Sequence, residues 1–207
     1  MLNVDSISKT INGKKILDKI SFSMTAGEKI VFLSPSDLVT TTLFQILMGE
    51  MQPDSGSFSW GVTTSRAYLP ADNSSYFDGC QLTITDWLRQ YSTIKDEDFI
   101  RGFLGKMLFS GEEALKKVNV LSGGEKVRCM LSRMMLSGSN VLLLDGPTAH
   151  LDLESISSVN EGLTKFKGTI LFASHDHEFI QTVATRIIEI DEKIIEDRTC
   201  SFDEYLE

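Results

Sequence analysis

Residues 121–152 limit most strongly what this chain can fold into. The first half of this stretch repeats apolar residues at i, i+3, i+4, i+7 and i+8, which is typical of an amphipathic helix that ends near Gly138. These apolar residues are Val127, Met130, Leu131, Met134 and Met135. The continuous apolar run at 141–144 then predicts a parallel strand covered on both faces, with Asp145 at its carboxyl end. Because ligands bind at that end of the strands in open α/β sheets, we expect a binding site around Asp145.

The start of the predicted helix reads Ser122-Gly123-Gly124-Glu125. A serine followed three residues later by a glutamate is a capping box. Two glycines in a first helical turn, however, cost about 1 kcal/mol each relative to alanine. A plain cap has no use for them, whereas a ligand that approaches the backbone needs them. We therefore expect an anion to bind at this helix N-terminus.

These motifs carry a family resemblance. The segment LSGGEKVR resembles the signature motif of ATP-binding cassette (ABC) proteins, and VLLLDGPTAHLD resembles their Walker B strand and D-loop. The segment AHLDLES is most similar to the ABC-F class, the tandem-cassette ATPases that act on ribosomes. The resemblance extends over nearly the whole chain.

The resemblance implies an α/β fold, the P-loop NTPase-like ABC cassette. Its parts are a mainly parallel sheet flanked by helices, an N-terminal antiparallel β-subdomain and a small helical subdomain. We expect a single domain over residues 1–207, with the helical subdomain at approximately 82–137. In the N-terminal part, Asn12-Gly13 predicts a tight hairpin turn. The family has an adenine-stacking aromatic residue just before such a turn, but Thr10, Ile11 and Asn12 stand here.

The amino-acid composition limits which partners the chain can bind and in which cellular compartment we expect it. The net charge of −9 is unfavourable for a nucleic-acid-binding surface, so any ribosome contact must come from a local patch or another domain. Cys80, Cys129 and Cys200 follow no metal-ligand spacing and are typical of reduced thiols. No apolar run approaches the roughly 18 residues of a membrane span, and the N-terminus shows no signal-peptide pattern. We therefore expect a cytoplasmic protein without direct membrane insertion.

A strand-like run at 30–33 and the helical pattern after it form the context of a phosphate-binding P-loop. The loop should read G-x-x-x-x-G-K-[ST], but residues 34–41 read SPSDLVTT, so both glycines and the lysine are absent. The resemblance places the nucleotide-binding positions, degenerate here, at Ser34, Ser36, Asp37, Val39, Thr40, Thr41 and Thr42. Asp37 puts a carboxylate where phosphate should lie and is a candidate helix N-cap. The β-branched Val39 resists positive φ. An ordinary capped loop is favoured over a working P-loop.

Other catalytic positions implied by the resemblance are also altered. The residue after Asp145 should be a glutamate that polarises the attacking water, and it is Gly146. The Q-loop glutamine is replaced by Ala71, and the usual D-loop asparagine by Ala149. Thr41 and Asp145 remain as candidate Mg²⁺ ligands. His175 follows the apolar run at 169–173 and is the candidate switch histidine, which touches the γ-phosphate in the family.

In ABC proteins two cassettes pair head to tail, so that each ATP lies between one cassette's P-loop and the other's signature. The resemblance therefore implies a second cassette as partner, in the same chain or in a dimer. The signature residues that would complete that partner's ATP site in trans are Leu121, Ser122, Gly123, Gly124 and Glu125. Asp152 belongs to the D-loop and also predicts a helix cap. Since the interval between Ala71 and Ser122 has no room for the long arm of an ABC-F first cassette, the chain resembles a second cassette.

Three functions stay open. The chain could be an ABC-F-like cassette of a translation-associated ATPase, with ATP and Mg²⁺ bound weakly or in trans and its own-site hydrolysis impaired. It could be a competent ATPase that uses unusual residues. It could instead be a dimerisation or interaction module that ignores nucleotide. An ATPase subunit of an ABC transporter is a further alternative, and the ribosome is a candidate partner for the first function.

Overall fold

The computed structural model describes residues 1–207, and its larger sheet has six strands in the order β5-β6-β7-β3-β8-β9. All neighbouring pairs are parallel except β8 with β9. The strands are β3 (Lys29–Leu33), β5 (Arg66–Leu69), β6 (Val141–Asp145), β7 (Thr169–Ala173), β8 (Arg186–Asp191) and β9 (Lys193–Arg198). The three apolar runs that predicted buried strands form β3, β6 and β7, which lie side by side as expected.

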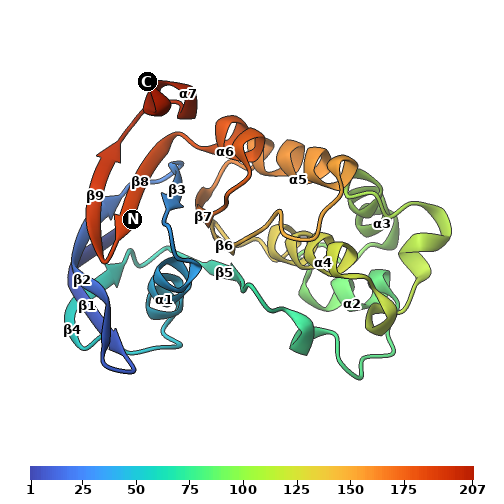
Figure 1. Cartoon of the computed structure of the whole chain (residues 1–207). Helices are drawn as coiled ribbons and strands as arrows, with labels where there is room; N and C mark the ends of the chain where they lie inside the picture. The colour runs from blue at the N-terminus through green and yellow to red at the C-terminus, as the bar shows by residue number, and fades with distance from the viewer.

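The two faces of the six-stranded sheet are covered by different elements (Figure 1). Leu142 and Leu144 of β6 pack into one hydrophobic core with α4 (Gly123–Leu136), α5 (Leu153–Lys165) and α6 (His177–Val183). Val141 and Leu143 pack into a second core with α1 (Asp37–Met48) and the N-terminal strands. Because successive side chains of a strand point to opposite faces, a continuous apolar run is required when both faces are covered.

A three-stranded antiparallel sheet, ordered β2-β1-β4, forms the N-terminal part of the fold. Its strands are β1 (Leu2–Ile11), β2 (Lys14–Met24) and β4 (Ser55–Trp60). The hairpin between β1 and β2 turns at Asn12 and Gly13, which have φ angles of 51° and 79°. Positive φ at both central residues is what a type I′ hairpin requires, so the predicted turn is confirmed.

The range 82–137 contains α2 (Ile84–Tyr91), α3 (Glu97–Lys106) and α4. Together they form the lobe farthest from the N-terminal sheet in Figure 1. Three short 3₁₀ turns connect the elements around them, at Ser74–Tyr76, Gly111–Leu115 and Val118–Val120. A short helix, α7 (Phe202–Leu206), lies near the C-terminus. No helix combines the length and the apolar character that crossing a bilayer requires.

Two apolar residues in the first helical turns are exposed. Phe99 is 42% exposed and Leu153 is 80% exposed. Phe99 lies three residues after the capping residue Asp96, and Leu153 lies directly after the capping residue Asp152. Both side chains face away from the packed core, whereas Ile100, next to Phe99, is fully buried.

Candidate functional site

The carboxyl ends of β3, β6 and β7 meet at one edge of the sheet, because these three strands are adjacent and parallel. Here the Thr41 hydroxyl donates a hydrogen bond of 2.6 Å to Asp145 Oδ2. His175, two residues beyond β7, places its Nε2 2.9 Å from Asp37 Oδ1. Four of the residues expected at the site are thus brought together in two contacting pairs.

Thr40, which was expected among the nucleotide-binding positions, does not join these pairs. Thr40 is only 2% exposed, and its hydroxyl donates to the Asp37 carbonyl at 3.0 Å. Thr42 is also buried and donates to the Leu38 carbonyl at 2.6 Å. Because α1 begins at Asp37, the three threonines point in different directions around the helix, and only Thr41 faces the site.

The expectation that Asp37 caps α1 is also wrong. Ser36 is the N-cap by its backbone, although no side chain accepts from the helix there. Asp37 is the first helical residue and contacts His175 instead, with 82% and 72% of the respective side chains exposed. A carboxylate in the first turn is still favoured by the helix dipole. The side chain where a phosphate was expected therefore links α1 to the end of β7.

The loop between β3 and α1 lacks the backbone of a phosphate-binding nest. No residue among Ser34, Pro35 and Ser36 has a positive φ. Ser34 is buried, and its hydroxyl accepts from the Ser36 N–H at 3.2 Å. Val39, expected to resist positive φ, lies within α1 and is buried. The loop therefore lacks the backbone conformation that directs successive N–H groups at a common point.

We name the adjoining cavity of about 290 Å³ the acidic pocket, because three aspartates and no lysine or arginine line it. The lining residues are Asp37, Thr41, Ala71, Asp145, Gly146, Thr148, Ala149, Ala173, Ser174, His175 and Asp176. Carboxylates repel phosphate oxygens by a few kcal/mol at about 4 Å near a protein surface. The triphosphate of ATP does not fit this set of residues.

Asp145 is the most buried carboxylate of the pocket, at 5% exposed. Burial is the largest influence and raises the pKa of Asp145 above its ordinary value. The hydrogen bond from Thr41 lowers this pKa, and the charge of Asp37 raises it. The ionised form of Asp145 therefore carries a free-energy cost in the folded chain.

Thr41 and Asp145 are the two oxygen donors expected for Mg²⁺, and they are hydrogen-bonded to each other. No group of three or more His, Cys, Asp or Glu side chains is placed to hold a metal. Protein-bound Mg²⁺ takes close to six oxygens and usually obtains several from phosphates and water. Because phosphates do not fit, these two residues alone do not build a magnesium site.

In the turn after β6, Gly146 stands where a catalytic glutamate was expected. The backbone conformation there, as well as the side chain, differs from what a glutamate would favour. Gly146 has a φ of 66°, a conformation that glycine adopts without cost and that strains other residues. Its N–H donates to the Ala173 carbonyl at 3.0 Å, and its carbonyl accepts from the Ala149 N–H at 3.1 Å. Gly146 stands at the expected position of the base, and Ala71 at that of the water-contacting residue. Both line the acidic pocket, and neither has a side chain able to act in catalysis.

The signature residues form a complete capping box at the start of α4. Ser122 Oγ accepts from the Glu125 N–H at 3.3 Å, and the Glu125 carboxylate accepts from the Ser122 N–H at 2.8 Å. Lys116 lies 2.8 Å from the same carboxylate. Leu121 is buried, whereas Ser122 and Gly123 are exposed. The helix N-terminus is therefore locally stable and open to the surface.

The two glycines of the signature lie in different surroundings. A Cβ on Gly124 would lie 2.9 Å from the His150 carbonyl oxygen, so a close approach of the chain's own D-loop explains this glycine. A Cβ on Gly123 would meet nothing nearer than 3.6 Å. The inference that both glycines make room for a ligand is therefore wrong for Gly124, and it stays a prediction for Gly123.

A second cavity, of about 370 Å³, lies between the signature and β6, and we name it the signature-side pocket. It shares Ala71, Asp145, Gly146 and Ala149 with the acidic pocket and adds Gly123 and Lys126, among others. Lys126 is the only cation along its walls. Sequence reasoning missed this residue, although its position in the first turn of α4, beside the two glycines, was a usable signal.

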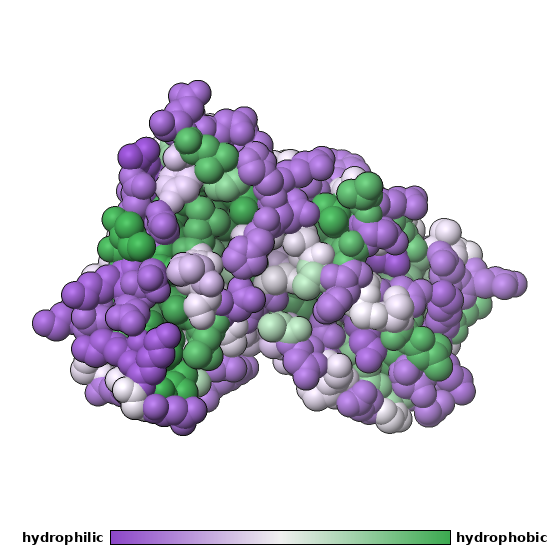
Figure 2. All heavy atoms as spheres, in the orientation of Figure 1, coloured by the Kyte–Doolittle hydropathy of each residue, from purple (hydrophilic) through white to green (hydrophobic).

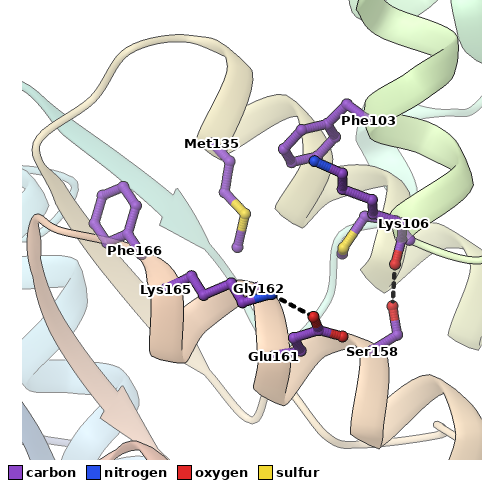
Figure 3. A pocket seen from close by; sticks show the side chains of 9 residues that line it. Phe103, Lys106, Met135, Ser158, Glu161, Gly162, Lys165 and Phe166 are labelled. Carbon is purple, nitrogen blue, oxygen red and sulfur yellow. Dashed lines mark hydrogen bonds and ion pairs between the residues drawn. The ribbon is translucent and has the colours of Figure 1, made fainter.

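The remaining candidate residues lie apart from both pockets. Asp152 caps α5 by accepting from the Ser155 N–H at 2.8 Å, as predicted. His177 lies on α6 with its ring 4.7 Å from the ring of Phe202. The largest cavity, of about 440 Å³, is mainly apolar, lies between α3, α4 and α5, and contains none of the predicted site residues (Figure 3).

Comparison with known proteins gives a family match and relatives. Residues 17–149 match the family described as "ABC transporter". The chain is 61% identical over 208 residues to the uncharacterized ABC transporter ATP-binding protein YkpA of Bacillus subtilis strain 168, covering 100% of the chain and 38% of that protein. It is 31% identical over 214 residues to the energy-dependent translational throttle protein EttA of Escherichia coli K12, covering 100% and 38%. The chain thus spans less than half the length of these relatives.

The fold is similar to that of a solved cassette. The structure titled "Dimeric structure of a post-hydrolysis state of the ATP-binding cassette MJ0796 bound to ADP and Pi" superposes with a TM-score of 0.80. The match covers 96% of this chain and 98% of that chain at 17% sequence identity. The predicted α/β cassette fold is confirmed.

Proposed function

The chain belongs to the ABC transporter family, and we propose on that basis that it is an ABC-F-like ATP-binding cassette whose signature completes the ATP site of a partner cassette. Its own site hydrolyses ATP poorly or not at all. The partner cassette belongs to the same longer protein or to a dimer, and that partner's P-loop holds the ATP and Mg²⁺. The cytoplasm is the expected compartment.

The contrast between the two ends of the site carries this proposal. At the P-loop position, Asp37 and two further aspartates line a pocket without lysine or arginine. At the signature, the capping box is complete and Gly123 leaves the helix N-terminus open. Backbone N–H groups at a helix N-terminus favour an anion, so the signature can still meet a phosphate that the chain's own loop does not hold.

A role in translation is supported by two observations of different kinds. The AHLDLES segment resembles ABC-F proteins, and one relative is named a translational throttle protein. The chain covers 38% of that relative, so a ribosome contact of the longer protein could also come from other parts. We propose the ribosome as the target of the whole assembly.

Two substitutions of Ser122 test the signature role in the protein that contains this chain and a cassette with an intact P-loop. Both Asn and Asp can replace Ser as helix N-cap, so Ser122→Asn and Ser122→Asp should fold alike. Asp adds a negative charge where we place the partner's γ-phosphate. We expect ATP turnover to be at least about tenfold lower for Ser122→Asp than for Ser122→Asn, the equivalent of 1.4 kcal/mol.

Ser23→Arg is a suitable surface control, because Ser23 is exposed on β2 in the antiparallel sheet. Equal turnover of the Ser122→Asn and Ser122→Asp proteins would overturn the trans role. The second candidate function, a nucleotide-independent interaction module, would then be favoured.

A further inference from the structure

A third pocket, of about 330 Å³, lies away from the nucleotide-site residues and shares no lining residue with the acidic or the signature-side pocket. It is formed by the end of α1, strand β5, and helices α2 and α4. The molecular surface is indented between the lobe that carries α1 and the lobe that carries α2 and α4 (Figure 2). We name this cavity the arginine pocket, for Arg66 and Arg133 in its walls.

Arg133 is held in place by aromatic rings and keeps its polar edge free. Its guanidinium carbon lies 4.1 Å from the ring centre of Tyr91, 4.9 Å from that of Tyr76 and 5.7 Å from that of Trp87. Its one hydrogen-bond acceptor is the Met130 sulfur, at 3.9 Å, and it forms no ion pair. The rings fix the guanidinium and leave most of its donors unused.

Arg66, in the opposite wall, has a similar arrangement. It lies 5.1 Å over the Trp60 ring and donates to the Leu47 carbonyl at 3.1 Å, again without an ion pair. Of the other five arginines, Arg89, Arg101, Arg186 and Arg198 each pair with a carboxylate, and Arg128 donates to the Met107 and Leu108 carbonyls outside this pocket. In a chain with 29 acidic and 20 basic residues, two arginines without a carboxylate in one pocket indicate a site kept for an external anion.

Tyr68 is a further polar residue in the lining of this pocket. The residue is 7% exposed, and its buried hydroxyl has no hydrogen-bond partner. Burial raises the pKa of Tyr68, and the charges of Asp145 and Glu50 add to the rise, so the hydroxyl keeps its proton at neutral pH. An unpaired buried hydroxyl is unfavourable, and a hydrogen-bond acceptor bound within its reach would satisfy it.

We propose that the arginine pocket binds a phosphate group. Donors from β5 and α4 line the same cavity, and two guanidinium groups and a phenol suit an anion with more oxygens than the two of a carboxylate. A phosphate has the additional oxygens and accepts bidentate arginine contacts. Glu50 is the one acidic residue in the walls and opposes the binding. This inference does not depend on the function proposed above.

The phosphate could be free or carried by a nucleic acid strand, and the two sources share this chemistry. The first probe is inorganic phosphate, titrated into the 207-residue chain while the Nε–Hε signals of the arginines are followed by NMR. We expect the signals of Arg66 and Arg133 to shift and those of Arg101 to stay. Absence of a shift at Arg66 and Arg133, or equal binding of acetate, would overturn the proposal.

Variants that remove a donor or an acidic group from the pocket test phosphate binding further. Arg133→Gln should raise the Kd for phosphate about tenfold or more, because a charged hydrogen bond is lost. Tyr68→Phe keeps the ring and should weaken binding less, whereas Glu50→Gln should tighten it. Arg101→Gln, outside the pocket, is the control and should change nothing. If Arg133→Gln disturbs folding, Tyr68→Phe and Glu50→Gln still decide, and unchanged binding in both would overturn the proposal.

A short oligoribonucleotide that carries either a 5′-phosphate or a 5′-hydroxyl distinguishes a free phosphate from one carried by a nucleic acid. Tighter binding of the phosphorylated strand than of inorganic phosphate supports a nucleic acid as carrier. Binding of inorganic phosphate alone supports a free ion. Binding of both strands equally, without a shift at Arg66 or Arg133, overturns the assignment of the pocket.

Discussion

The P-loop end and the signature end of the candidate site lie at the same edge of one sheet, yet they have changed differently. At the P-loop end, Asp37 contacts His175 and Thr41 contacts Asp145. At the signature end, the capping box is complete and Gly123 is exposed. The comparison teaches that the cassette architecture does not require the glycines and the lysine of the P-loop motif.

The reason is that fold and phosphate recognition rest on different residues. The sheet depends on the apolar runs of β3, β6 and β7, none of which is interrupted. Phosphate recognition depends on a few glycines and one lysine in the loop before α1. Helix α1 still begins directly after β3, because Ser36 and Asp37 provide a start that needs no ligand. We therefore expect that a few substitutions in the loop can weaken phosphate binding and leave the core intact.

Restoring the P-loop should have the largest effect. In its present form the chain should bind ATP with a millimolar Kd or weaker, so that ATP near its Kd adds only about 0.4 kcal/mol of stability. The triple variant Asp37→Gly, Val39→Gly, Thr40→Lys removes one carboxylate, frees the first turn of α1 and adds the missing ammonium. We expect the Kd measured by calorimetry to fall about a hundredfold, or ~3 kcal/mol.

Thr40→Lys alone is the matched control for this variant. Thr40 is 2% exposed, so a lysine there must bury its charge unless the first turn of α1 unwinds. We expect the single variant to lose stability and gain no affinity. Gly146→Glu should restore turnover only in the triple background with Ala71→Gln, because Gly146 has a positive φ and a base needs a bound phosphate. Turnover by Gly146→Glu alone would show that the present loop is functional.

Thr41→Val tests the contact that replaces Mg²⁺ coordination. The substitution keeps the shape of the side chain and leaves the buried Asp145 carboxylate without its donor. Loss of a hydrogen bond to a charged group costs about 1.5–3 kcal/mol, which a urea unfolding curve at neutral pH would measure. Thr182→Val, at an exposed threonine on α6, should change stability by less than about 0.5 kcal/mol.

The neighbouring glycines of the signature give an internal comparison. Gly124→Ala should destabilise the fold by about 1–3 kcal/mol, since the new Cβ would lie 2.9 Å from a backbone oxygen that cannot easily move. Gly123→Ala should stabilise it by up to about 1 kcal/mol through helix propensity. Thermal unfolding of both variants measures the difference. Equal effects would mean that the D-loop does not pack against α4 as the structure has it.

Asp145→Asn tests the free-energy cost of burying the Asp145 charge separately from the hydrogen bond that this side chain accepts from Thr41. The folded chain raises the pKa of Asp145, so the folded state binds the proton more tightly than the unfolded state. Stability from this group is therefore present at low pH and is lost as pH rises through the folded pKa. We expect the asparagine variant to be more stable than wild type at pH 7 and the difference to shrink towards pH 3. A difference independent of pH would contradict this assignment.

The sequence predicted the elements better than the directions of their side chains. The apolar runs and the Asn12-Gly13 turn predicted β3, β6, β7 and the first hairpin, because periodicity reports burial directly. Aligning the loop to a motif suggested that Thr40 faces the site, but a helix starting at Asp37 turns it inward. The arginine pocket has no local signal, since Arg66 and Arg133 come together only through the packing of β5 against α4.

The smallest expected effect concerns the Asp37–His175 pair. Its coupling energy shows whether this contact stabilises the arrangement of the P-loop end. Both side chains are largely exposed, and exposed ion pairs contribute about 0–1 kcal/mol. A double-mutant cycle with Asp37→Asn and His175→Gln should therefore give a coupling of at most ~1 kcal/mol.

The same cycle has a second readout that a simple surface pair would not show. The charge of Asp37 raises the pKa of Asp145, so Asp37→Asn should lower that pKa, which NMR of the carboxyl carbon can follow. Arg101→Gln, on α3 in the other lobe, should leave the Asp145 signal unchanged. If Asp37→Asn neither shifts Asp145 nor couples to His175, the contact does not hold α1 against β7. The loss of phosphate binding would then rest on the missing glycines and lysine alone.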